Sequence, residues 1–196
     1  MNYPPKHHQD NDKAHLIEVI KTYPLATLIS VENNEPLITH LPLVLEDEKL
    51  IGHIDIYNPQ AKLLRDNKDV TILFSGPQCY ISPSIYSTTQ LPTWNYIKLH
   101  LKGTVKAIES KTALKQSLIT MTEFLEAPDH KYVLEPDNPR LDRNLDYIEM
   151  FEINIRSWEG KFKLSQDKKP KDTENARAQL IRANQASVKQ FLDKVF

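Results

Sequence analysis

Two lysines near the end of the chain have the spacing of an anion-binding site. Lys161 and Lys163 lie two residues apart in the segment "GKFKLSQD" (160–167), and on a β-strand this spacing points both side chains to one face. Converging ammonium groups favour a phosphate or a carboxylate. Ser165 would lie on the same face if the strand continued, and the Gln166 amide offers a donor and an acceptor. The alternative is an exposed strand edge protected by lysines.

The segment "PTWNY" (92–96) places aromatic rings on both sides of an amide. Trp94 and Tyr96 flank Asn95. Two aromatic faces could hold a flat heteroaromatic ring while the amide bonds to the edge of that ring. In the alternative interpretation the segment is only the entrance to a strand, and Trp94 belongs to the core.

Histidines offer a third kind of chemistry. His40 lies in "THLPL" (39–43) and His53 lies in "GHIDIYNPQ" (52–60), so each could bind a metal ion. A catalytic zinc site requires a third protein ligand, for which Asp55 is a weak candidate. We therefore favour histidines that form hydrogen bonds on strands, and we assign no metal site to them.

Other catalytic patterns are not recognisable in the sequence. It contains no nucleophile elbow, no zinc-protease helix motif, no glycine-rich phosphate or dinucleotide loop, and no persuasive helix-turn-helix. The single cysteine, Cys79, excludes an internal disulfide, and its apolar setting indicates a buried structural residue. We assign no catalytic residue.

The first half of the chain predicts strands joined by tight turns. A short helix capped by Asn11 or Asp12 ends before Pro24. Short segments rich in β-branched residues follow, and polar turn residues separate them. The Asn58-Pro59 junction then begins a brief helical segment. The predicted strands cover residues 24–32, 35–46 and 49–55, with a buried central strand at 69–76.

The second half alternates between strand and helix patterns. In the segment 97–109 apolar and polar residues alternate, which predicts a strand with one dry and one wet face. The apolar residues are Ile97, Leu99, Leu101, Val105 and Ala107, and the polar ones are Lys98, His100, Lys102, Thr104 and Lys106. A helix is predicted over 110–126, a long loop or lid over 127–146, a strand over 147–158, and a final helix capped by Asp172 or Thr173. The apolar stripe of the first of these helices comprises Leu114, Leu118, Met121 and Leu125, and that of the final helix comprises Leu180, Val188, Phe191, Leu192 and Val195. The pattern indicates an α+β fold built on a small antiparallel barrel or sheet. We expect one domain, 1–196, with a C-terminal helix (about 172–195) as an appendage.

Charge and hydropathy narrow the classes of partner. The 196 residues include 25 Lys+Arg and 26 Asp+Glu, so the near-neutral chain has no strong electrostatic attraction to nucleic acid or anionic lipid. No window has the run of about 20 apolar residues that a membrane span needs, and the N-terminal segment lacks the apolar run of a signal peptide. We expect a cytoplasmic protein with no membrane partner.

Five motifs in one order resemble a known family. "HLPL", "GH" followed by "NP", "GP…YISPS", "PTWNY" and "GKFKLSQ" resemble the PaiB-type family of small bacterial FMN-binding split-barrel proteins, which are described as negative transcriptional regulators of protease production and sporulation. The resemblance covers almost the whole chain. It implies a six-stranded antiparallel Greek-key split barrel, a homodimer, and an FMN site at the dimer interface.

The resemblance also implies site residues. In related flavin split barrels the phosphate lies near a strand-to-helix turn, where basic and hydroxyl side chains hold it. By position, the cofactor-binding candidates near the phosphate are His53 and Asn58, with Thr39 and His40 on a neighbouring strand. The candidates that approach the ring or the phosphate from elsewhere in the dimer are Trp94, Lys161, Lys163 and Gln166.

The turn before Asn58 departs from the family pattern. The family usually carries an arginine between its histidine and its Asn-Pro pair, whereas this chain has Asp55, Ile56 and Tyr57, with Ile56 at the arginine's place. A hydrogen bond to a charged group contributes about 1.5–3 kcal/mol. Its loss would weaken FMN binding about tenfold to a hundredfold.

Three hypotheses follow for the function. The first is an FMN-binding, PaiB-like negative transcriptional regulator, which acts on DNA directly or through a partner. The second is a flavin-dependent oxidoreductase that acts on a small molecule. The third is a relative that kept the barrel and lost the flavin, and it is motivated by Asp55 and Ile56.

Overall fold

The computed structural model describes residues 4–65 and 67–195, and it describes side chains as far as residue 185. Its strands are β1 (Gln9–Asp10), β2 (Leu25–Glu32), β3 (Glu35–Glu46), β4 (Lys49–Asp55), β5 (Asp69–Ile81), β6 (Thr93–Ile108) and β7 (Ile148–Lys163). Its α-helices are α1 (Lys13–Thr22), α2 (Lys111–Glu126), α3 (Pro139–Asn144) and α4 (Pro170–Val195). Three short 3₁₀ turns complete the elements: η1 (Lys6–His8), η2 (Ala61–Leu63) and η3 (Pro83–Ile85).

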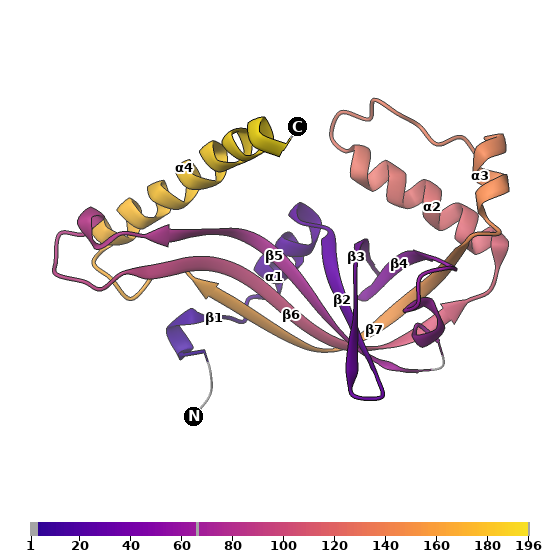
Figure 1. The fold of residues 1–196 in the computed structure, drawn as a ribbon, viewed down its shortest axis with the longest axis horizontal. Coiled ribbons are helices and arrows are strands. Elements are labelled where there is room, and N and C mark those ends of the chain that lie inside the picture. Colours follow the sequence, from indigo (N-terminus) through magenta and orange to yellow (C-terminus); the bar gives the residue numbers. More distant parts are fainter. Residues whose placement is uncertain (1–3, 66, 196) are drawn as a thin grey trace. The chain divides into compact units, whose positions relative to one another are not determined.

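The strands form one antiparallel sheet whose pairings close on themselves. Its order is β1-β7-β4-β3-β2-β5-β6, and β7 also pairs with β6. Six strands, β2 to β7, therefore bond in a ring, and the two-residue β1 adds to β7 outside it. In Figure 1 the paired β5 and β6 run side by side. The ring confirms the expected α+β split-barrel class, with β1 as one strand more than expected.

Two tight turns set the register of the first three strands. Asn33 and Asn34 join β2 to β3 with φ of 53° and 65°, and Asp47 and Glu48 join β3 to β4 with φ of 45° and 65°. Positive φ at both central residues gives the primed turn whose twist matches that of the strands. Asn and Asp tolerate this left-handed conformation better than most residues, which explains how a chain with four glycines builds these hairpins.

Contacts along the chain group into two compact units. The first unit comprises the residues up to 19, residues 74–100 and those from 159 onward, and the second comprises 20–73 and 101–158. The long strands β5, β6 and β7 each contribute to both. The interpretation of the chain as a single domain stays a prediction.

Each unit has its own buried apolar residues. In the second unit Leu28, Leu43, Ile72, Phe151 and Ile153 are almost fully buried. The alternation predicted for β6 is confirmed, because Leu99, Leu101 and Val105 are buried, whereas Lys102 and Lys106 are exposed.

The cluster of the first unit links β5 to the last helix. Its buried members are Cys79, Ile81, Ala176 and Leu180. The Cys79 thiol is free and buried, as expected, and burial raises the pKa of the Cys79 thiol. A buried thiol with a raised pKa is a poor nucleophile, so Cys79 contributes packing.

Two expectations about helices were wrong. The predicted loop over 127–146 contains a short helix, α3, which begins with the Asn138 side chain accepting a hydrogen bond from the Arg140 N–H. The last helix begins at Pro170, whose fixed φ suits a first helical position. Asp172 therefore lies inside α4 and does not cap it. The predicted apolar residues Val188, Phe191, Leu192 and Val195 lie outside the described side chains.

Candidate functional site

A cavity of about 330 Å³ in the first unit collects basic and hydroxyl side chains from distant parts of the chain. This volume is at the small end of the usual range for ligand sites, about 300–1,000 Å³. His8 comes from η1, and Lys163 ends β7. We call it the first-unit cavity, and the polar side chains that line it are His8, Tyr86, Gln90, Thr93, Lys163, Ser165, Asp167 and Lys168.

The end of β7 shapes this cavity. Strand β7 stops at Lys163, and Ser165 takes a left-handed conformation with φ of 62°. The expectation that the strand continues through Ser165 is therefore wrong. The Ser165 hydroxyl is buried and accepts a hydrogen bond of 3.0 Å from the Asn95 amide, and it lies 2.7 Å from the Tyr86 hydroxyl. This network holds the turn against β6 and η3.

The two lysines of "GKFKLSQD" have different surroundings. The Lys163 ammonium lines the first-unit cavity and donates to the Thr93 hydroxyl at 2.5 Å. The Lys161 ammonium lies 3.3 Å from the Glu159 carboxylate. Only Lys163 therefore presents its charge to the cavity, whereas Lys161 is partly neutralised by a carboxylate.

Two lysines, Lys163 and Lys168, and one aspartate, Asp167, line the cavity beside His8, which leaves a net positive charge. Burial lowers the pKa of the His8 imidazole, and the positive charges of His7, Lys163 and Lys168 lower it further against the opposing effect of Asp167. The ammonium of Lys168 is itself bound to the Asp167 carboxylate at 2.8 Å. The cavity can therefore attract an anion.

Gln166 takes a structural role in the turn. Its side-chain oxygen accepts a 2.7 Å hydrogen bond from the Leu164 N–H, and its amide donates to the Phe162 carbonyl. Both ends of the amide are thus engaged with the turn's own backbone. Gln166 shapes the turn after β7, and its contact with a ligand stays a prediction.

The aromatic segment before the alternating strand is half exposed. Trp94 is 50% exposed and Tyr80 is 48% exposed, and their ring centroids lie 6.4 Å apart on neighbouring strands. Asn95, between Trp94 and the half-buried Tyr96, is the buried member. The alternative that placed Trp94 in the core is wrong, and the exposed ring faces can stack on a flat ligand.

The other four predicted residues lie in the second unit. The Asn58 amide donates to the Thr39 hydroxyl at 3.1 Å, which joins β3 to the strand-to-helix turn. The His40 ring nitrogen lies 3.0 Å from the Thr27 hydroxyl on β2. Thr39, His40 and Asn58 therefore form hydrogen bonds between strands and to the turn. This agrees with the interpretation of His40 as a strand histidine that forms a hydrogen bond.

His53 faces helix α2. Its Nε2 lies 3.0 Å from the Ser117 hydroxyl, and burial lowers the pKa of His53 to about 4. The imidazole is therefore neutral at physiological pH and brings no positive charge to a phosphate. Ser117 was not predicted, although its place among apolar residues on one stripe of the helix is a signal that could have found it.

The turn after His53 carries no cation either. The Asp55 carboxylate accepts a 2.8 Å hydrogen bond from the Tyr57 N–H. The side-chain oxygen Oδ1 of Asn58 accepts a 2.9 Å hydrogen bond from the Gln60 N–H. Ile56 is half-buried and Tyr57 is exposed. These side chains stabilise the turn through its own backbone, and they do not form a cationic cradle.

Comparisons with known proteins place the chain. A family model described as "Putative FMN-binding domain" matches residues 2–157. The chain belongs to this FMN-binding domain family. It is also 27% identical over 196 residues to the "Protease synthase and sporulation protein PAI 2" of Bacillus subtilis (strain 168), covering 97% of this chain and 95% of that protein. The PaiB-type resemblance is thereby confirmed.

Solved structures support the fold of this FMN-binding domain family member. The FAD- and heme-binding protein of Mycobacterium smegmatis superposes with a TM-score of 0.64 at 16% identity, over 80% of this chain and 73% of that one. The flavocytochrome Anf3 of Azotobacter vinelandii gives a TM-score of 0.64 at 15% identity, over 79% and 69%. At these identities the similarity supports the split-barrel fold.

The described side chains fit FMN better in one unit than in the other. A phosphate needs cations and hydroxyl donors, and the first-unit cavity supplies Lys163, Lys168, Tyr86 and Thr93. A flavin ring needs aromatic or apolar faces, which the exposed Trp94 and Tyr80 provide. At residues 55–58 the donor set contains a carboxylate and no cation. Sequence reasoning missed Tyr86, Thr93 and His8, because only the fold brings them beside Lys163.

Proposed function

We propose that this protein binds FMN and acts as a PaiB-like negative regulator of gene expression. The match of the FMN-binding family model to residues 2–157 carries the proposal. The similarity to a protease synthase and sporulation protein along nearly its whole length supports the regulatory part.

The first-unit cavity is the place where we expect the anionic end of FMN. Lys163 contacts Thr93, and Thr93 directly precedes Trp94. Lys163 and Thr93 therefore offer a cation and a hydroxyl to the phosphate end of FMN. Trp94 does not line the cavity, and successive residues of a strand point to opposite faces, so this placement concerns the phosphate alone.

A titration of the purified protein with FMN tests binding. We expect flavin absorption in freshly purified protein, or quenching of flavin fluorescence when FMN is added. Lys163→Ala should weaken binding about tenfold to a hundredfold, because a hydrogen bond to a charged group contributes about 1.5–3 kcal/mol. Lys161→Ala should have a smaller effect, since Glu159 already balances its charge.

Lys98→Ala is the matched control, because Lys98 lies on the polar face of β6 and does not line the cavity. Equal FMN affinities for Lys163→Ala and Lys98→Ala would refute the placement in the cavity. Absence of flavin absorption together with unchanged fluorescence during the titration would refute FMN binding itself.

The regulatory part requires a second assay. A near-neutral chain gives little nonspecific attraction to DNA, so a direct regulator should bind its own upstream region with clear dependence on sequence. A gel-shift assay at low salt, with and without FMN, tests this. No shift with either form would eliminate direct DNA binding and leave regulation through a protein partner. Sedimentation of the same sample would test the homodimer that we expect.

One observation favours a cofactor-free relative as the second candidate. The turn expected to hold the phosphate has Asp55 and Ile56, and the nearby family histidine, His53, is neutral because burial lowers its pKa to about 4. If the family uses only this turn, FMN would not bind. This candidate would be established if the protein bound no FMN in the titration and still bound its upstream DNA in the gel-shift assay.

A further inference from the structure

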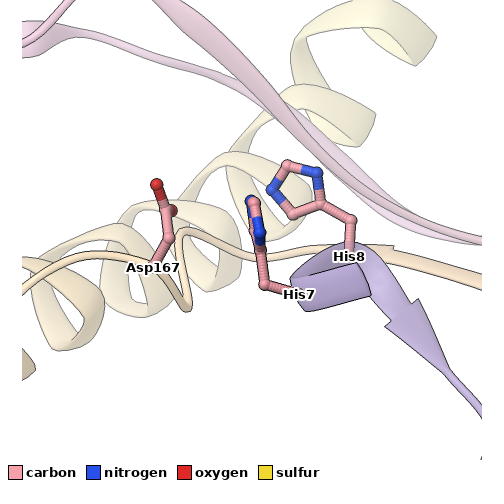
Figure 2. Close-up of side chains that lie close together, drawn as sticks. All are labelled: His7, His8 and Asp167. Atoms are coloured by element: carbon pink, nitrogen blue, oxygen red, sulfur yellow. The ribbon is translucent and has the colours of Figure 1, made fainter. Parts of the chain in front are cut away.

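Two consecutive histidines lie beside an aspartate that is 159 residues away in the sequence. His7 and His8 end the 3₁₀ turn η1, and Asp167 lies in the turn between β7 and α4. The pairing of β1 with β7, Gln9 with Lys161, fixes η1 next to the end of β7. Figure 2 shows the two imidazoles and the carboxylate on the same side of the backbone.

The ligand atoms are close enough to meet at one ion. One ligand atom from each of the three side chains lies within 4.8 Å of the other two. A tetrahedral ion with bonds of about 2.0–2.1 Å separates its ligand atoms by about 3.3 Å. The side chains would therefore approach one another by no more than about 1.5 Å. His7 is exposed, and its ring packs edge-on against the ring of His8 with the centroids 4.1 Å apart.

We propose that His7, His8 and Asp167 form a binding site for a divalent transition metal ion, for which Zn²⁺ is the closest chemical match. Two imidazoles and one carboxylate are a ligand set of catalytic zinc sites and of other open metal sites. Among the described residues this is the group of histidine and acidic side chains close enough to share an ion.

The position of the site gives it an open face. His8 and Asp167 both line the first-unit cavity, so an ion bound to them would lie at the cavity wall. Three protein ligands leave at least one coordination position of a tetrahedral ion for water or an anion. Lys163, across the same cavity, would favour an anion there. The ion would border the cavity where we expect the FMN phosphate, so the metal test below uses protein without FMN and its outcome does not depend on FMN binding.

Zinc titration by calorimetry of the metal-free protein, with Co²⁺ absorption as a second probe, tests the site. We expect one ion per chain. His8→Ala and Asp167→Asn should each weaken binding by more than about 100-fold, because loss of even a second-shell partner costs about 10–100-fold. Lys168→Ala should strengthen binding about two- to fivefold, since it frees the carboxylate from an ion pair and removes a nearby positive charge.

His15→Ala is the matched control. His15 lies in the same unit and pairs with Asp10 at 2.9 Å, so it could itself attract zinc. Unchanged affinity in this variant is expected. Binding that disappears with His15→Ala, or that persists in His8→Ala and Asp167→Asn, would overturn the assignment, as would a wild-type protein that binds neither ion. A misfolded variant would bind zinc less tightly, so the higher zinc affinity expected for Lys168→Ala cannot arise from misfolding. An unchanged or lower affinity in this variant would therefore count against the site.

Discussion

Replacing His53 should remove a pH-dependent part of the protein's stability. Burial lowers the pKa of His53 from 6.5 to about 4. The unfolded chain therefore binds a proton at this residue near pH 6.5, whereas the folded protein does not bind it until about pH 4. Folding is consequently weakened as the pH falls through this window, and the loss is complete below the lower value.

The size of the effect follows from the two pKa values. One pKa unit corresponds to about 1.4 kcal/mol. The fall from 6.5 to about 4 therefore corresponds to a loss of about 3 kcal/mol in the free energy of unfolding. Between pH 7 and pH 5 the free energy of unfolding should fall by about 2 kcal/mol because of His53. With a urea m-value of about 2 kcal/mol per molar, the midpoint would fall by about 1 M.

Urea denaturation of the wild type and of His53→Gln at pH 7 and pH 5 measures this difference. Glutamine keeps a polar side chain next to Ser117 and does not titrate. The lowered pKa values of His8 and His100 act equally in both proteins and cancel. If His53→Gln loses as much stability as the wild type over this range, His53 is not buried against α2 in the way described.

Two further predictions concern packing and turns. Gly52→Ala should destabilise the protein by about 1–3 kcal/mol, because a Cβ there would lie 2.5 Å from Leu43 and 2.7 Å from Phe151. Thermal unfolding measures this loss of stability, and an unchanged melting temperature would contradict the close approach. Asn33→Ala should cost about 1–2 kcal/mol through its left-handed backbone, whereas Asn34→Gly, which relieves the same constraint, should be neutral or stabilising in the same urea assay.

Local patterns predicted the strands well. The alternation along 97–109 matches β6, and the polar pairs Asn33-Asn34 and Asp47-Glu48 are the turns of the first hairpins. These features depend on neighbouring residues, so the sequence contains the information directly. The helical stripe of α2 was likewise correct at Leu114 and Met121, whereas Leu125 is exposed.

The candidate site depended on tertiary contacts that no local pattern shows. Lys163 was predicted, but its partner Thr93 is 70 residues away, and His8 is farther still. The left-handed Ser165 ended β7 where periodicity alone continued it. Asp172 resembles a helix cap in the sequence, yet its carboxylate accepts a 2.7 Å hydrogen bond from the Ser87 N–H, a residue on another segment.

None of the helices within the described residues combines the length and hydropathy needed to cross a membrane.

The ring of strands is closed at β7. Of the six strands in the ring, β7 pairs with β4 on one side and with β6 on the other.

The place of β7 in the chain affects the order of folding. It comes last among these strands along the chain, and until residues 148–163 have left the ribosome, β4 and β6 each have one unpaired edge. Unpaired edges recruit other strands, and pairings between distant segments form slowly. A chain truncated just before Ile148 would lack β7 and would expose the unpaired edges of both β4 and β6. We therefore expect such products to aggregate more than the full chain does.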